Sequence, residues 1–83
     1  MAMLIQTNGD VLESFSLRNF KHAQETVGGL VEVVRLGDRV LLVHEEAIIK
    51  NEPLNVTASI LARQEIFGEA ILLSEAEAAR ILN

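Results

Sequence analysis

The stretch Gly28-Gly29-Leu30-Val31-Glu32-Val33-Val34-Arg35-Leu36 holds the densest run of β-branched residues in the chain. β-Branched side chains pack well on a pleated sheet, so residues 30–36 are predicted to form the central strand. Gly37-Asp38 is typical of a turn, and Arg39-Val40-Leu41-Leu42-Val43-His44 is predicted to return as the partner strand. Both strands carry apolar residues at successive positions. This indicates cover on both faces, either by helices alone or by helices and a partner chain, and so gives a first indication of self-association.

A helix is predicted before this strand. Leu17, Phe20 and Val27 recur at helical spacing, and Ser16 stands where an N-cap is needed. Gly28-Gly29 would end the helix, because a glycine takes the left-handed conformation that other residues resist. The same pair could form a backbone nest for a phosphate. The C-terminal end of a helix disfavours an anion, however, because it carries a negative partial charge.

The N-terminal segment is predicted to be a hairpin. Met3-Leu4-Ile5-Gln6-Thr7 and Val11-Leu12-Glu13-Ser14-Phe15 flank Asn8-Gly9, which is the strongest short hairpin signal. Residues 45–50 are compatible either with a continued strand or with a turn that leads to a short edge strand.

Pro53 cannot continue a central strand and fits the first turn of a helix. We place this helix at Leu54–Arg63. The spacing of Leu54, Ala58 and Leu61 predicts that these three side chains face inward.

The chain is predicted to close with a strand and a helix. Glu69-Ala70-Ile71-Leu72-Leu73 is predicted to be a strand introduced by Gly68. Ser74 and Glu77 have the spacing of a capping box, so a short helix is predicted over 75–82.

Strands and helices therefore mix without regular βαβ spacing, which favours an α+β fold. We expect a single domain over residues 1–83, as the length of 83 residues suggests. Its mostly antiparallel β-sheet would have four to five strands, with two to three short helices on one face.

The composition limits the chemistry that the chain can perform. It contains no Cys, Tyr or Trp, so disulfides, thiolate nucleophiles and Cys-ligated metals are excluded. The two His residues have no Ser or Asp partner at a diagnostic spacing. We therefore expect a non-enzyme without a cofactor.

Charge and hydropathy limit the classes of partner that can be expected. Twelve acidic and seven basic residues give a formal net charge of -5, which disfavours duplex nucleic acid. No apolar run reaches the ~18–20 residues that a membrane span needs. The first residues lack the basic segment of a signal peptide. A soluble, cytoplasmic protein with no membrane partner is the expectation.

Four blocks of the sequence resemble the uncharacterised family known as domain of unknown function 3846. The family pattern is a VGG-hydrophobic-E-V-V block, an N-E-E block, a P-x-N-x-x-A-T block and a final G-hydrophobic strand. The matching blocks here lie within residues 20–73 and are Val27-Gly28-Gly29-Leu30-Val31-Glu32-Val33-Val34, Val43-His44-Glu45-Glu46, Pro53-Leu54-Asn55-Val56-Thr57-Ala58 and Phe67-Gly68-Glu69-Ala70-Ile71-Leu72-Leu73. Two positions depart from the pattern. His44 replaces the usual Asn, and Thr57-Ala58 reverses the usual Ala-Thr order.

The resemblance indicates in which genomes such proteins occur, but it implies no activity. Members occur in phages, other mobile elements and bacteria, so the family suggests an accessory protein that binds something belonging to the host. By analogy with other small phage proteins, it suggests a homo-oligomer that sequesters a nucleotide-derived immune signal without cleaving it. The alternative is an interaction module that inhibits or modulates a host protein.

Residues 51–57 carry the polar groups best suited to contact a ligand. Asn51, Asn55 and Thr57 offer hydrogen-bond donors and acceptors near a helix start, although Asn51 and Asn55 could equally be ordinary caps. Arg35 and Arg39 flank a turn and could clamp a phosphate, or could be exposed charges that protect a sheet edge. Together with His44 as a stacking or polar group, these residues form the predicted ligand site: Arg35, Arg39, His44, Asn51, Asn55 and Thr57.

A metal-assisted hydrolase is a third hypothesis. His44 and Glu46 would share a face if the strand continued that far. Two ligands are too few for a closed metal site, so no metal is predicted and a solvated strand end is the simpler interpretation.

Overall fold

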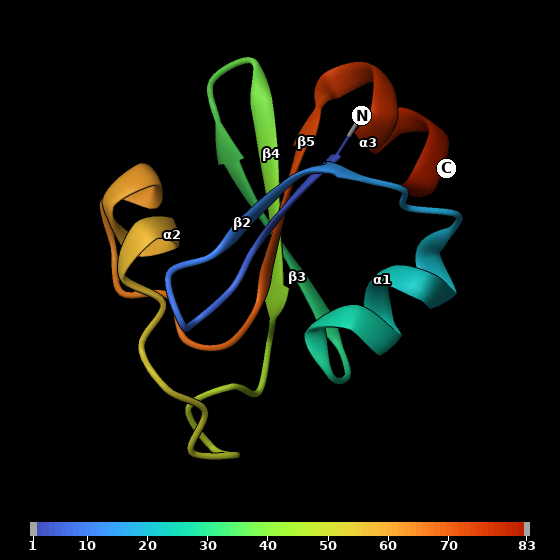
Figure 1. Cartoon of the computed structure of the whole chain (residues 1–83). Coiled ribbons are helices and arrows are strands. Elements are labelled where there is room, and N and C mark those ends of the chain that lie inside the picture. The colour runs from blue at the N-terminus through green and yellow to red at the C-terminus, as the bar shows by residue number, and fades with distance from the viewer. Residues whose placement is uncertain (1, 83) are drawn as a thin grey trace.

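The computed structural model describes residues 2–82, which form one five-stranded antiparallel sheet and three helices (Figure 1). This confirms the α+β class. In chain order the elements are β1 (Ala2–Ile5), β2 (Val11–Phe15), α1 (Phe20–Val27), β3 (Val31–Leu36), β4 (Arg39–His44), α2 (Val56–Ala62), β5 (Ala70–Ser74) and α3 (Glu75–Leu82).

The strand order is β2-β1-β5-β4-β3, so the last strand of the chain lies in the middle of the sheet. β5 pairs antiparallel with both β1 and β4 and thereby joins the two hairpins. The β-branched strand β3 lies at an edge, and the prediction that it is central is wrong. A dense run of β-branched residues favours a strand, but long-range pairing decides which strand becomes the centre.

The two faces of the sheet carry separate cores. Along β4, Val40 and Leu42 pack with α1 and α3, whereas Leu41 and Val43 pack with α2. This alternation is the ordinary consequence of a strand whose side chains point to opposite faces. Figure 1 shows α1 and α3 on one side of the sheet and α2 on the other.

Two helices share a face, as predicted, but α2 covers the opposite face. The apolar positions on successive residues of β4 are therefore satisfied within the chain. A partner chain is not needed to cover either face, so this ground for self-association is removed.

The helix ends follow capping chemistry. Asn19, not Ser16, is the N-cap of α1, because its carboxamide oxygen accepts the His22 N–H at 2.8 Å. Gly28 ends α1 in the left-handed conformation with φ of 100°, as predicted. The Ser74 hydroxyl accepts the Glu77 N–H at 3.2 Å, which confirms the cap that opens α3.

α2 is shorter than predicted and is oriented differently. It begins after Asn55, whose side chain caps it. Ala58 is fully buried as expected, but Leu54 and Leu61 are exposed. The prediction that Leu54 and Leu61 face inward is therefore wrong, because the small side chain of Ala58 is the one that packs against the sheet.

Residues 45–50 form a turn at the end of β4. The hypothesis that the strand continues to Glu46 is therefore wrong, and with it the shared face of His44 and Glu46. Among residues 2–82, none of the helices has the length and apolar character that crossing a bilayer requires.

Candidate functional site

A pair made of a buried histidine and a partly buried glutamate lies at the end of the sheet where β4 leads into the 45–50 turn. The His44 side chain is almost fully buried, and its Nδ1 is bonded to the Glu52 carboxylate. Because a carboxylate accepts, Nδ1 carries the donated hydrogen. The bond ties the last residue of β4 to the segment that returns from the turn toward α2.

Glycines surround this pair. A Cβ built on Gly29 would lie 2.7 Å from His44 Nε2, and a Cβ built on Gly68 would lie 2.9 Å from Glu52 Oε1. Any side chain at either position would enter the space that the pair occupies. The glycines are therefore part of the site, since they let the backbone approach the imidazole and the carboxylate.

This arrangement gives the His44 imidazole a fixed orientation and one unused nitrogen. A carboxylate that holds one ring nitrogen is the usual partner of a catalytic or metal-ligating imidazole. Here Nε2 is buried and makes no hydrogen bond, and Gly29 stands directly against it. Within residues 2–82, no group of three or more His, Cys, Asp and Glu side chains could hold a metal ion. The pair therefore acts first as a clasp that holds the 45–52 segment against the sheet.

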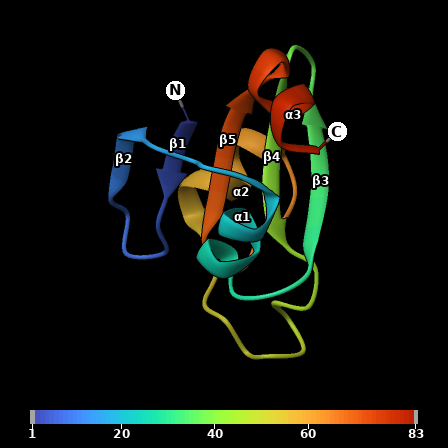
Figure 2. The same ribbon diagram turned by 90° about the vertical axis from the view of Figure 1, so that its right-hand side faces the viewer.

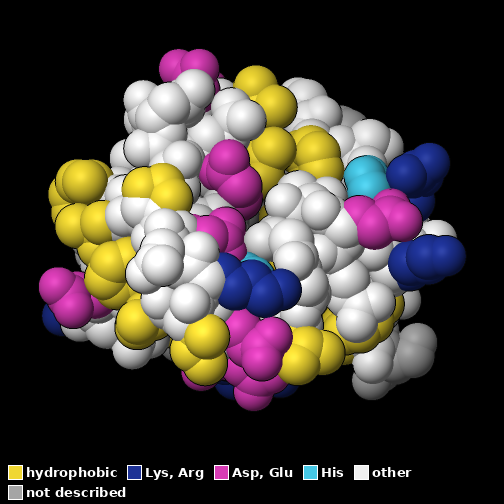
Figure 3. All heavy atoms as spheres, turned by 90° about the horizontal axis from the view of Figure 1, so that it is seen from below, with side chains coloured by type: hydrophobic (Ala, Val, Ile, Leu, Met, Phe, Trp, Pro, Cys, Tyr) yellow, Lys and Arg dark blue, Asp and Glu magenta, His cyan; other side chains and the backbone are white. Residues whose placement is uncertain are grey.

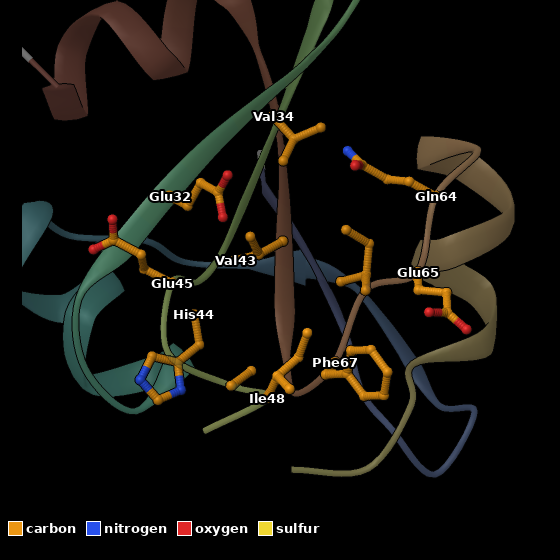
Figure 4. Close-up of a pocket in the computed structure, with 11 residues that line it drawn as sticks. Glu32, Val34, Val43, His44, Glu45, Ile48, Gln64, Glu65 and Phe67 are labelled. Atoms are coloured by element: carbon orange, nitrogen blue, oxygen red, sulfur yellow. The ribbon is translucent and has the colours of Figure 1, made fainter. Parts of the chain in front are cut away.

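A hollow of about 100 Å³ lies beside the clasp, on the face that α2 covers (Figure 4). Its lining includes the apolar side chains of Val34, Val43 and Phe67. Glu32 of β3 and Gln64, just after α2, point toward each other across it (Figure 4). The glutamates at positions 32, 45 and 65 line the hollow, and no Lys or Arg does so. The volume of the hollow is well below the ~300 Å³ of common small-molecule pockets. The negative charge of its glutamates favours a cation over an anion.

The predicted arginine clamp does not form. In the β3–β4 hairpin Arg35 pairs with Val40, and Leu36 pairs with Arg39. Arg35 and Arg39 therefore occupy positions on opposite faces of the sheet. A single chain cannot use both guanidinium groups on one phosphate at this turn.

The other predicted ligand residues have separate environments. Asn55 is fully buried, and its side chain bonds to three backbone groups. Asn51 is exposed in the turn with φ of 56°, and Thr57 is half-buried in the first turn of α2. The structure thus brings only His44 and the 51–57 segment together, through Glu52. Sequence reasoning did not identify Glu52, because no motif links two residues eight positions apart across a turn.

An apolar surface lies next to the hollow. Six exposed aliphatic residues belong to the 45–50 turn and to the segment 54–61, and we call them the α2 surface: Ile48, Ile49, Leu54, Val56, Ile60 and Leu61. Ile48 also lines the hollow together with residues 64–67, so the two features adjoin. Figure 3 shows hydrophobic side chains gathered toward the side of the molecule on which α2 lies.

The model of one protein family matches this chain. It is described as a domain of unknown function (DUF3846), and it matches residues 1–81, which confirms the resemblance drawn from the four sequence blocks. Neither the curated proteins nor the solved structures include a match. The glycines of the first and last blocks and the histidine of the second meet at the clasp. The chain belongs to the DUF3846 family.

Proposed function

We propose that this protein is a non-enzymatic binding module that docks on a partner protein through the α2 surface. The observation that carries the proposal is the outward face of α2. Val56 and Ile60 are 59% and 72% exposed, whereas the inward side chain of this helix is Ala58. A helix that packs through alanine and turns its larger aliphatic side chains to solvent is typical of an interface.

The 45–50 turn extends the same surface. Ile48 and Ile49 are 71% and 79% exposed at the tip of the segment that the clasp holds. Exposed isoleucines at a fixed turn can insert into an apolar pocket of a partner with little ordering cost. The glutamates that line the adjacent hollow favour a partner whose contact surface is apolar at its centre and basic at its rim.

A nucleotide-like ligand sequestered by a homo-oligomer in the host cytoplasm is the second proposal. In one chain the residues that would bind such a ligand are separated. Arg35 and Arg39 point to opposite faces of the sheet, and the Asn55 side chain is already hydrogen-bonded to backbone groups. The proposal therefore requires a second copy to complete the site. Isothermal titration with cyclic and ADP-ribose-type nucleotides tests it, and an absence of heat on folded protein contradicts it.

The variant Ile60→Glu tests the docking proposal. Because Ile60 is exposed, the change is expected to alter the free energy of unfolding by less than about 0.5 kcal/mol. It should nevertheless reduce capture of a stoichiometric protein partner from host lysate at least tenfold, as expected for a charge placed in the apolar centre of an interface. The measurement is quantitative mass spectrometry of proteins retained by immobilised wild type and variant.

Leu12→Glu is the matched control. Leu12 is 47% exposed on β2, away from the α2 surface, so this variant should capture the partner as the wild type does. Equal capture by Ile60→Glu and wild type would contradict the proposal. Native mass spectrometry that finds a retained small molecule and no protein partner would favour the second proposal instead.

A further inference from the structure

β3 is an open edge of the sheet. It is last in the strand order, and Figure 2 shows it at the side of the sheet opposite β2. All six of its residues pair with β4 in unbroken register. The other edge differs, because the register of β2 against β1 shifts between Ala2 and Leu4. Such an irregularity protects an edge from pairing with another strand, and β3 lacks this protection.

The backbone groups that β3 directs outward can be identified from the register. Glu45 N–H donates to Leu30 O at 2.8 Å, which marks residue 30 as one that bonds toward β4. Hydrogen-bonding positions alternate in an antiparallel pair, so residues 30, 32, 34 and 36 bond toward β4. Val31, Val33 and Arg35 then direct their N–H and C=O groups away from the sheet.

We propose that a second copy of this chain pairs with β3 through these groups, antiparallel and around a two-fold axis at Val33. An axis perpendicular to the sheet keeps the α2-covered faces of both copies on one side. Residues that pair across two antiparallel strands point to the same face of the sheet. Because side chains alternate along a strand, each residue of β3 must pair either with its own counterpart in the second copy or with a residue two or four positions along. This holds only where the two-fold axis passes beside a residue of β3, which we call the centre of the register.

The sequence of β3 favours the register centred on Val33. Centring on Glu32 or on Arg35 would place like charges directly opposite one another, which is destabilising. Centring on Val34 would pair Val31 with Gly37, which lies in the turn and not in the strand. Centring on Val33 pairs Val33 with itself and Val31 with Arg35 of the second copy. All three outward residues are then satisfied, with six hydrogen bonds expected from three such pairs.

The resulting assembly is a continuous ten-stranded sheet. Val34 of the second copy would lie opposite Glu32, which lines the hollow on the α2-covered face. Each hollow therefore gains a wall from the other copy. This surface is separate from the α2 surface, so the dimer and the docking proposal can fail independently.

Sedimentation equilibrium of the wild type, Val33→Pro and Val11→Pro tests the dimer. Proline at position 33 removes an outward N–H without breaking a bond to β4. Each copy loses one interfacial hydrogen bond, two in all, so the dissociation constant of the dimer should rise about thirtyfold. Val11→Pro places a proline on the other edge, where Gln6 N–H to Asp10 O at 2.9 Å marks Val11 as an outward position. It should leave the dissociation constant unchanged.

Amide hydrogen exchange of the wild type provides a measurement that does not depend on the folding of a variant. The N–H groups of Val31, Val33 and Arg35 should exchange more slowly as protein concentration rises, whereas that of Val11 should not change. A wild type that remains monomeric at about 1 mM, a concentration at which even weak complexes form, overturns the proposal. A dimer that Val33→Pro does not weaken, or one without concentration-dependent protection at these three amides, also overturns it.

Discussion

Replacing Asn55 with alanine is expected to lower the free energy of unfolding by about 2–4 kcal/mol. The side chain is fully buried. Its Nδ2 donates to Ile5 O and to Gly68 O, both at 2.9 Å, and its Oδ1 accepts the Ala58 N–H at 3.1 Å. Alanine would leave two carbonyls and one amide buried without these partners. Urea unfolding followed by circular dichroism measures the change.

Asn19→Ala is the matched control for this experiment. Asn19 also caps a helix, but its side chain makes one bond, to His22 N–H, and is exposed. Its replacement should cost about 1 kcal/mol, the usual value for a cap. The excess at position 55 then measures the two bonds that its side chain makes to Ile5 of β1 and to Gly68, two residues before β5. If the two variants lose the same stability, Asn55 is an ordinary cap and this interpretation is wrong.

Asn55 also shows which part of the site the sequence determines. An asparagine ahead of a helical pattern indicates a cap, and the structure confirms a cap at this position. The sequence could not show that the amide nitrogen would be buried between Ile5 and Gly68, which are 50 and 13 residues away. Local capping chemistry is encoded locally, whereas burial depends on β5 entering the middle of the sheet.

The same distinction applies to the fold. Asn8-Gly9 and Gly37-Asp38 predicted two hairpins, and both form, because a hairpin is specified by its turn and its adjacent residues. No local signal states which hairpin pairs with the last strand or which face a helix covers. The positions of β3 at the edge and of α2 on the second face are therefore findings of the structure.

The failure of the arginine clamp has a different cause, because local information was sufficient to exclude it. A two-residue turn at Gly37-Asp38 places Leu36 opposite Arg39. Leu36 and Arg39 therefore share a face, and Arg35, the residue before Leu36, must point to the opposite face. Residues that are close in sequence do not have neighbouring side chains when the two-residue period of the strand places them on opposite faces.

The clasp explains why conservative changes near it are expected to have unequal effects. His44 is buried and tied to Glu52, so its ring cannot move aside easily. Gly29 and Gly28 both face this ring, but for different reasons. Gly29 has an ordinary backbone conformation and a close contact, whereas Gly28 has φ of 100° and no atom within 3.8 Å of an added Cβ, the nearest being His44 Nδ1 at 3.9 Å.

Gly29→Ala is expected to lower the free energy of unfolding by about 1–3 kcal/mol, because its Cβ would lie 2.7 Å from His44 Nε2. In a His44→Ala background the same substitution should cost less than about 0.5 kcal/mol, since the ring that it meets is gone. Gly28→Ala is the matched control. Its cost of about 1–2 kcal/mol comes from the left-handed backbone and should persist in both backgrounds. Urea unfolding of the six proteins measures these differences. A cost of Gly29→Ala that survives the loss of His44 would mean that the glycine is required by the backbone and not by the clasp.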